Sequence, residues 1–281
     1  MAYIMYRNKR YNTGRSNVLL YGIKELSPKV TGDTIKGLPD VTKFAIPNGI
    51  TAIGNSAFRN NDSLLEVTIP DSVTSIGENA FDNSTALTNI IIPDSVTSIG
   101  NAAFFGCESF TNITIPSNVT SINGATFAYC IALTNINIPD SVTSIGDEAF
   151  KGCLVLPNIN IPDGVTSIGK EAFSECKAFT NINIPDSVAS IGENAFDNCI
   201  ALTSINIPVG VTTIEKATFD SCTALTSVAI PNSVTSIGRY AFDGCSALTD
   251  VYYSGTQSEW DSITISSGND YLKKATIHYN S

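Results

Sequence analysis

The sequence predicts a repeat solenoid, in which the chain winds into stacked rungs of constant length. Three observations predict it: an Ile-Pro pair that recurs every 23 residues, apolar residues at fixed places between the pairs, and a short β-branched segment before each pair. We count rung positions from the Ile of the pair, which is position 0. This Ile occurs nine times without an insertion, at Ile46, Ile69, Ile92, Ile115, Ile138, Ile161, Ile184, Ile207 and Ile230.

Three apolar positions keep their identity along the array. Position 7 is Ile in all nine rungs, from Ile53 to Ile237, and position 12 is Phe in all nine, from Phe58 to Phe242. Position 4 is Val in eight rungs and Ile50 in the first. A constant side chain at a constant phase is typical of a column in which each residue packs on its copy in the next rung. One inserted residue would displace every column, which explains the fixed rung length.

The segment before each pair predicts a short strand. The stretch "LTNINI", from Leu133 to Ile138, is β-branched and alternates apolar and polar residues at its end. Each strand meets its copy one rung later in the same direction, so we expect one parallel sheet with about 4.8 Å between strands. The Pro ends the strand because it has no N–H to donate.

The segment after position 7 predicts short helices or 3-10 turns opposite the sheet. In "SIGENAF", Ser75 stands three residues before Glu78, which is the spacing of a capping box, and Phe81 would point inward. The predicted fold class is therefore a strand-rich α/β solenoid: a right-handed superhelix of 23-residue rungs with one parallel sheet and short helices or 3-10 turns opposite, capped at both ends.

Composition and charge exclude several partner classes. The chain of 281 residues is 43% apolar and 15% charged, which is typical of a folded protein. No run approaches eighteen apolar residues, so we expect no membrane span. Residues 44–281 carry eight Lys or Arg against twenty-three acids, and this acidic body argues against nucleic acid. Residues 1–43 carry a net charge of +5, which we interpret as a solvated N-terminal extension.

All seven cysteines occupy position 15, and the two earliest rungs have Asn61 and Ser84 there. Cα atoms about 5 Å apart would permit disulfides between rungs, but parallel side chains and an odd count oppose pairing. No C-x-x-C motif or nearby His predicts a metal site. We therefore interpret position 15 as a column of small buried thiols, which fits a reducing compartment. The cysteines are Cys107, Cys130, Cys153, Cys176, Cys199, Cys222 and Cys245.

The pattern "LxxIxIPxxVxxIGxxAFxxC" resembles the BspA-like, or Treponema pallidum-type, leucine-rich repeat. The resemblance covers 41–253, so the predicted domains are an N-terminal extension or cap (1–40), a leucine-rich-repeat solenoid of about nine repeats (41–253) and a C-terminal cap (254–281). In the last, "TQSEWDSI" predicts a helix with Trp260 packing inward, and "ATIHY" predicts a closing strand. The family implies a curved solenoid, frequently on bacterial or protist surface proteins, in adhesion and protein–protein contact.

The sequence offers little catalytic chemistry. Its single His, His278, lies in the predicted closing strand, where we expect a partly exposed edge position rather than a catalytic imidazole. No glycine-rich phosphate loop follows a strand. Asp follows the Pro in five rungs, and a bound calcium ion or a plain turn in solvent would each explain that column; we favour the turn. We expect no enzyme activity, metal or cofactor. The five acids are Asp71, Asp94, Asp140, Asp163 and Asp186.

The outward side of the predicted strands is the candidate binding surface. Positions 20 and 22 present uncharged side chains, mostly amides, which donate and accept hydrogen bonds and so suit peptides or glycans. The alternative is that the amides stack and bond only to each other. We call this set the amide face: Asn112, Thr114, Asn135, Asn137, Asn158, Asn160, Asn181, Asn183 and Asn206.

The sequence thus predicts a non-enzymatic binding or adhesion module, expected to be a monomer, whose partner is a protein or a glycan. An alternative is a structural component of a larger assembly, such as a phage or tail-like particle, docked through residues 1–40. The location stays open. The family resemblance implies a cell surface, whereas the first twenty residues lack the apolar core of a secretory signal peptide. The protein therefore stays in the cell, leaves by another route or has lost a leader.

Overall fold

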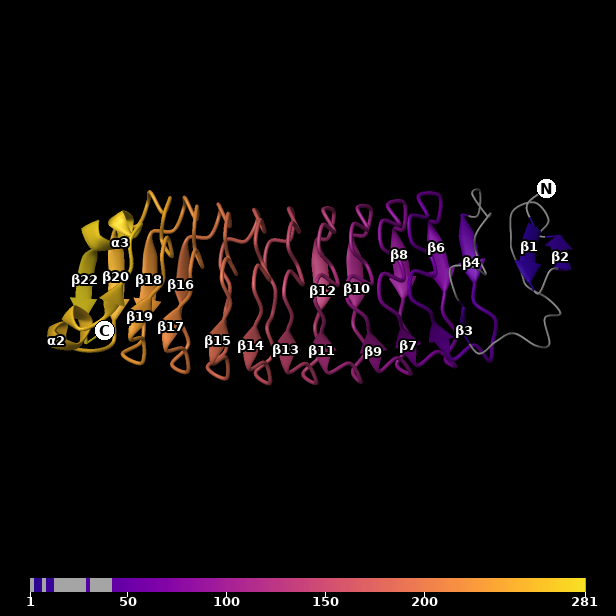
Figure 1. The fold of residues 1–281 in the computed structure, drawn as a ribbon, viewed down its shortest axis with the longest axis horizontal. Coiled ribbons are helices and arrows are strands. Elements are labelled where there is room, and N and C mark those ends of the chain that lie inside the picture. The colour runs from indigo at the N-terminus through magenta and orange to yellow at the C-terminus, as the bar shows by residue number, and fades with distance from the viewer. Residues whose placement is uncertain (1–2, 7–8, 13–28, 31–41, 281) are drawn as a thin grey trace.

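The computed structural model describes residues 3–6, 9–12, 29–30 and 42–280. Within the last range the chain forms a β-solenoid whose rungs stack along one axis (Figure 1). Most rungs give one strand to a main sheet, just before the Ile-Pro pair, and one to a second sheet at positions 6 and 7. At 158–160 and 181–183 the main sheet is reduced to an isolated bridge. No helix in the described part of the chain is long and apolar enough to cross a membrane.

The main sheet is parallel, as predicted. Partner residues in neighbouring regular rungs are 23 apart, so Asn112 lies opposite Asn135. Its strands are β4 (Lys43–Ala45), β6 (Glu66–Thr68), β8 (Asn89–Ile91), β10 (Asn112–Thr114), β12 (Asn135–Asn137), β16 (Ser204–Asn206), β18 (Ser227–Ile230), β20 (Asp250–Tyr253) and β22 (Thr276–Tyr279).

The second sheet corrects the prediction of a single sheet. Its two-residue strands are too short for an alternation that a sequence would reveal, and the invariant Ile at position 7 is their inward residue. They are β3 (Lys29–Val30), β5 (Ala52–Ile53), β7 (Ser75–Ile76), β9 (Ser98–Ile99), β11 (Ser121–Ile122), β13 (Ser144–Ile145), β14 (Ser167–Ile168), β15 (Ser190–Ile191), β17 (Thr213–Ile214), β19 (Ser236–Ile237) and β21 (Thr264–Ile265).

Of the two alternatives predicted opposite the main sheet, short helices or 3-10 turns, the described rungs have turns, with i→i−3 bonds such as Ala57 N to Gly54 O at 3.2 Å. Positions 8–14 form successive turns in which positions 10 and 14 have positive φ, as at Ser56 (55°) and Asn60 (57°). The N–H groups of positions 10, 12 and 14 donate to carbonyls of the next rung, for example Phe58 N to Ala80 O at 2.7 Å. A helix would consume these donors within its own rung. Ser75, the expected helix cap, lies instead in β7.

The core is a set of columns, which confirms the predicted role of the invariant residues. The Phe rings at position 12 stack with centroids 4.9–5.6 Å apart and interplanar angles of 0–24°. All seven cysteines are free and buried, as expected for a thiol column. Offset stacking at this spacing adds to the burial of each ring.

The C-terminal cap contains the predicted helix and closing strand. Helix α2 (Gln257–Asp261) begins with a capping box between Thr256 and Glu259. Trp260 packs edge-on against Tyr253, with ring centroids 5.2 Å apart. The sequence did not reveal a second helix, α3 (Asp270–Lys274), or the buried Asn269 before it. The Asn269 side chain bonds to Phe242 N and Gly238 O, so it ties the cap to the last regular rung.

The N-terminal segment carries one correction. Strands β1 (Tyr3–Tyr6) and β2 (Lys9–Asn12) form an antiparallel pair. Strand β3 pairs with β5 at the 23-residue offset, so the repeat phase begins before residue 41, where the predicted solenoid starts. The other residues of this segment lie outside the described part. Their capping or docking role, and the boundaries at 40 and 253, stay predictions.

Candidate binding face

The outer surface of the main sheet, which we call the strand face, carries every residue of the amide face. Alternation along each strand turns positions 20 and 22 outward and position 21 inward. In β12, Asn135 and Asn137 are exposed whereas Ile136 is buried. The other seven residues of the amide face are likewise exposed.

The register of the main sheet aligns these side chains in two columns. Asn112 pairs with Asn135 and Thr114 with Asn137. Further along, an isolated bridge pairs Asn160 with Asn183. The ladder is interrupted there, as it also is between β8 and β10. Pro157 has no N–H to make the bond that Thr134 N makes with Thr111 O at 2.9 Å. The columns thus continue in register across the interruption.

The amides are not used for holding the rungs together. Of the amide-face side chains, Asn112 donates to the adjacent Thr111 Oγ1 at 3.0 Å. Among the described residues, the asparagines of the amide face form no hydrogen bond with one another, which contradicts the alternative of a self-bonded ladder. The neighbouring threonines at position 19 behave differently: Thr134 Oγ1 donates to Thr111 O and Thr203 Oγ1 to Thr180 O, both at 3.0 Å. Threonines thus bind the backbone, whereas the amides face solvent.

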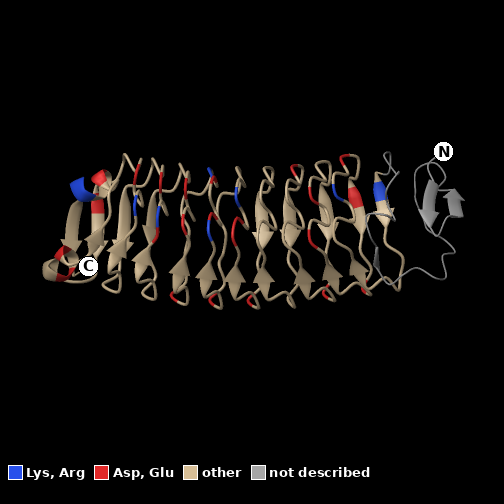
Figure 2. Ribbon diagram, viewed as in Figure 1, with Lys and Arg blue, Asp and Glu red and all other residues tan. Residues whose placement is uncertain are grey.

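The strand face is uncharged between its two ends. Figure 2 marks charged residues on β4, β6 and β20, and none on the main-sheet strands between β6 and β20. At the N-terminal end, Lys43 Nζ pairs with Glu66 Oε2 at 2.6 Å. Surface pairs of this kind contribute little to stability. The amide face therefore lies in a long uncharged stretch of the strand face, and charged residues lie only at the two ends of that stretch.

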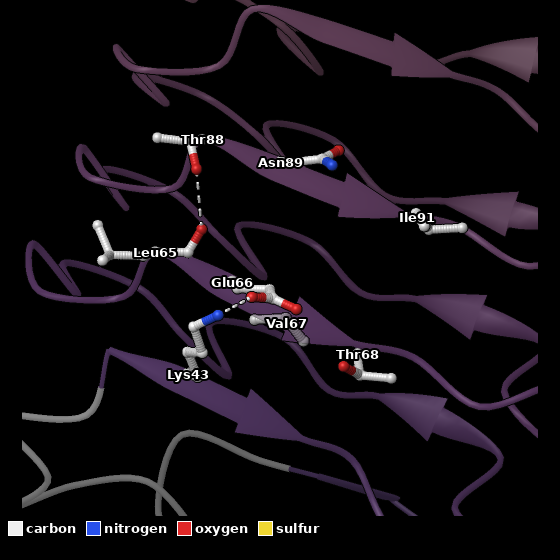
Figure 3. A pocket seen from close by; sticks show the side chains of 8 residues that line it. All are labelled: Lys43, Leu65, Glu66, Val67, Thr68, Thr88, Asn89 and Ile91. Carbon is white, nitrogen blue, oxygen red and sulfur yellow. Dashed lines mark hydrogen bonds and ion pairs between the residues drawn. The ribbon is translucent and has the colours of Figure 1, made fainter. Parts of the chain in front are cut away.

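Two hollows deepen the N-terminal part of the strand face. One of about 450 Å³ extends from Lys43 and Glu66 to Asn89 and Ile91 (Figure 3). The second, of about 260 Å³, shares Asn89 and Ile91 and reaches Asn135. Ile91 is 76% exposed, the highest value among the large apolar residues that the structure describes. Sequence analysis missed it, although the run of three Ile at 90–92 breaks the alternation and marks an outward apolar residue.

The C-terminal end of the same face carries an aromatic pair that sequence analysis also missed. The rings of Tyr252 and His278 stack with centroids 4.8 Å apart and an interplanar angle of 15°. His278 Nε2 lies 2.7 Å from Asp250 Oδ1, and Thr249 Oγ1 donates to Asp250 Oδ2 at 2.7 Å. The hydrogen bond from His278 lowers the pKa of Asp250. His278 is partly exposed in β22, as predicted.

Among the residues that the structure describes, no three His, Cys, Asp or Glu side chains are grouped so that they could hold a metal ion. The five acids that follow Pro are exposed at the corner beside the strand face. Asp82 is buried, and its Oδ2 pairs with Arg59 Nε at 2.7 Å.

The comparisons with known proteins agree with this architecture. A family model described as "BspA type Leucine rich repeat region (6 copies)" matches residues 34–156 and 143–269. The chain belongs to this family. Among solved structures, it is 30% identical to a leucine rich cell surface protein from Faecalibacterium prausnitzii, covering 81% of this chain and 92% of that one with a TM-score of 0.41. A comparison with curated protein sequences found no match.

Two further structures are similar to this BspA-type chain. The T. pallidum leucine rich repeat protein is 25% identical over 75% of this chain and 80% of that one, with a TM-score of 0.41. The pneumococcal vaccine antigen PcpA is 20% identical over 85% of this chain and 68% of that one, with a TM-score of 0.55, and it supports the fold alone. Repeat solenoids of this type use their extended surfaces for binding.

Proposed function

We propose that this BspA-type chain is a non-enzymatic binding module whose partner, a protein or a glycan, contacts the amide face. The observation that carries the proposal is that these asparagines are exposed, aligned in register and not bonded to one another. Each amide offers donors and acceptors that a partner can use. Membership of the BspA-type leucine-rich repeat family supports a binding role, because repeat solenoids commonly bind through their extended surfaces.

The strand face is a better candidate than the other two sides of the rung. On the second sheet, threonines at position 5 donate to the backbone of the preceding rung, as Thr143 Oγ1 does to Thr120 O at 3.2 Å. On the turn side, asparagines at positions 10 and 14, such as Asn79 and Asn83, serve backbone conformations with positive φ, which Asn tolerates. Both sides thus use their polar residues for the fold.

A catalytic role has less support. The single imidazole, His278, is oriented by Asp250, but among the described residues no Ser or Thr hydroxyl and no Cys thiol is bonded to it. The seven thiols are buried, and burial raises their pKa values, to about 12 for Cys130 and Cys245. A thiol with a raised pKa is a poor nucleophile at neutral pH.

Binding by a charged variant and its matched control tests the proposal. The test variant carries Asn135→Lys, Asn158→Lys and Asn181→Lys on the strand face. The control carries Ser144→Lys, Ser167→Lys and Ser190→Lys on the second sheet, at the same 23-residue spacing and with the same added charge. Each chain is applied to a glycan array and to an array of purified extracellular proteins, after its melting temperature has been compared with the unmodified chain.

We expect every partner of the unmodified chain to be retained by the control and lost by the strand-face variant. Three lysines about 4.8 Å apart repel each other equally in both variants, so a general loss of stability affects both. Partners retained by the strand-face variant and lost by the control would contradict the proposal and assign binding to the second sheet.

A further inference from the structure

We infer that the partner of the amide face is a linear, uncharged polysaccharide that lies along the solenoid axis, a proposal that rests on the binding function above. The strand face has no charge between Glu66 and Asp250. The exposed acids at its border, such as Asp140, Asp163 and Asp186, repel anionic chains. A neutral polymer rich in hydroxyl groups satisfies exposed amides without needing a counter-charge.

The spacing of the columns favours a sugar chain over an extended peptide. Neighbouring rungs present the same amide about every 4.8 Å, the distance between strands. That distance is close to the length of one sugar unit in an extended polysaccharide, so successive sugars meet successive rungs in the same way. An extended peptide rises about 3.3 Å per residue, so its equivalent side chains recur roughly every 6.6 Å and fall out of step.

The other ways in which a polypeptide binds also lack support on this face. Adding a strand requires an open sheet edge, and the face of a sheet has its backbone groups already paired. Protein interfaces are usually anchored by Trp, Tyr or Arg side chains. The outward positions from Thr88 to Ala229 hold Thr, Asn, Ser, Ala, Pro and Ile91, and none of those three anchors. A protein partner therefore lacks its usual anchoring residues there.

The two ends of the face supply the apolar contacts that a sugar ring also needs. One surface of a sugar ring presents C–H groups, which pack on aromatic or aliphatic side chains. Tyr252, 43% exposed and stacked on His278, lies in the position-22 column beyond Asn206 and Ala229. Ile91 lies in the same column before Thr114, beside the two hollows. The amides thus lie between two apolar platforms.

Titration calorimetry with oligosaccharides of graded length tests the inference. The probes are cello-, chito-, manno- and malto-oligosaccharides of two to six units, with oligogalacturonates as the charged comparison. The chains are the unmodified protein, a variant with Asn112→Ala, Asn135→Ala and Asn158→Ala, and a control with Ser121→Ala, Ser144→Ala and Ser167→Ala on the second sheet. Alanine removes the amides without adding charge, and equal melting temperatures establish that the variants are folded.

We expect at least one neutral series to bind, with an affinity that rises about two- to tenfold for each added sugar as one more rung is engaged. The Asn-to-Ala variant should lose at least tenfold in affinity, and the control should match the unmodified chain. Equal or tighter binding of oligogalacturonates, or affinity independent of length, would overturn the inference.

Failure of this inference is distinguishable from failure of the proposed function. If no neutral oligosaccharide binds, but a purified protein binds the unmodified chain and not the Asn135→Lys, Asn158→Lys, Asn181→Lys variant, the polysaccharide inference is wrong and the proposed binding face is supported. If the binding of neither sugars nor proteins depends on these asparagines, both proposals are wrong.

Discussion

At position 15, the side chain of each rung from the second onward donates a hydrogen bond to the Phe carbonyl of the preceding rung. Cys153 Sγ lies 3.3 Å from Phe127 O, and Ser84 Oγ lies 2.8 Å from Phe58 O. Both residues are fully buried. The column therefore selects a small side chain with a donor, which explains why Ser replaces Cys in one rung.

Replacing Cys153 by Ser or Val separates packing from hydrogen bonding. We expect Cys153→Ser to change the free energy of unfolding by no more than about 1 kcal/mol, because Ser keeps the bond to Phe127 O. Cys153→Val removes the donor and adds a methyl group to a close-packed column, which costs about 1–3 kcal/mol. Urea unfolding measures both. A valine variant as stable as the serine variant would show that the hydrogen bond contributes nothing.

A second residue-scale feature is a stack of acids on the turn side. Burial raises the pKa of Asp197, and the nearby Asp220 and Glu175 raise it further, whereas hydrogen bonds from Asn198 and Ser174 oppose the shift. Burial and Asp243 likewise raise the pKa of Asp220. A carboxyl whose folded pKa exceeds its unfolded value binds more protons when folded, so its contribution to stability is present at low pH and lost as pH rises through the folded pKa.

Asp197→Asn tests this sign. The variant should have a higher urea midpoint than the unmodified chain at about pH 7, and the gain should vanish below the unfolded pKa of about 3.9. Asp186→Asn, at an exposed corner, is the control for a general effect of lower net charge. A gain that is equal at both pH values, or equal in the two variants, would contradict the assignment to Asp197.

Among the elements, the second sheet depends on glycine at position 8. A Cβ on Gly169 would lie 2.5 Å from Asp147 N of the preceding rung, so the rungs approach too closely for any other residue. Two rungs have Asn123 and Glu215 instead, and the second sheet is interrupted before each of them, between β9 and β11 and between β15 and β17. A side chain at position 8 therefore breaks the ladder where it occurs.

Both exceptions carry a compensating residue. Position 11 is Ala in the other rungs but Thr126 and Thr218 in these two. Their hydroxyl groups donate to the position-8 carbonyls of Asn123 and Glu215 at 2.7 and 2.8 Å. Asn123 Nδ2 also donates to Ile99 O at 2.6 Å. In the rungs from the second onward that have glycine at position 8, the glycine N–H donates to the corresponding Ile carbonyl of the preceding rung.

Opposite substitutions at position 8 should have opposite effects. Gly169→Ala should cost about 1–3 kcal/mol, because the Cβ meets backbone that has to move. It should also speed amide exchange in β14. Glu215→Gly with Thr218→Ala should restore the pairing of β15 with β17 and slow exchange there. Hydrogen exchange read by mass spectrometry measures both. Unchanged exchange in Gly169→Ala would contradict the account of the glycine.

At the scale of the whole molecule, much of the fold follows from sequence because each rung repeats the same apolar positions at the same spacing. Invariant Ile and Phe predicted the columns, and the fixed 23-residue period predicted the register. The turn side was predicted only in part: turns were one of the two alternatives, but in "SIGENAF" the spacing of Ser75 and Glu78 favours a helix. The hydrogen bonds between rungs replace the bonds that a helix would make within its own rung. Such bonds join residues far apart in sequence, so no local pattern reveals them.

The amide face was predictable because alternation assigns positions 20 and 22 to the outside. Whether its amides bond to each other depends on side-chain geometry, which a sequence does not contain. The two ends of the face were missed for different reasons. Ile91 is a single departure from the pattern, and the Tyr252–His278 pair forms only when the cap folds back onto β20.

One measurement tests the central claim directly, that partners bind at the strand face. Side-chain amide resonances of a ¹⁵N-labelled chain are recorded by NMR with and without a bound partner. The first partner to be added is the neutral oligosaccharide that binds most tightly in the calorimetric experiment. We predict that signals of Asn112, Asn135 and Asn158 shift, while those of Asn79 and Asn194 on the turn side stay in place. Shifts confined to the turn-side asparagines, with the strand-face signals unmoved, would contradict the account.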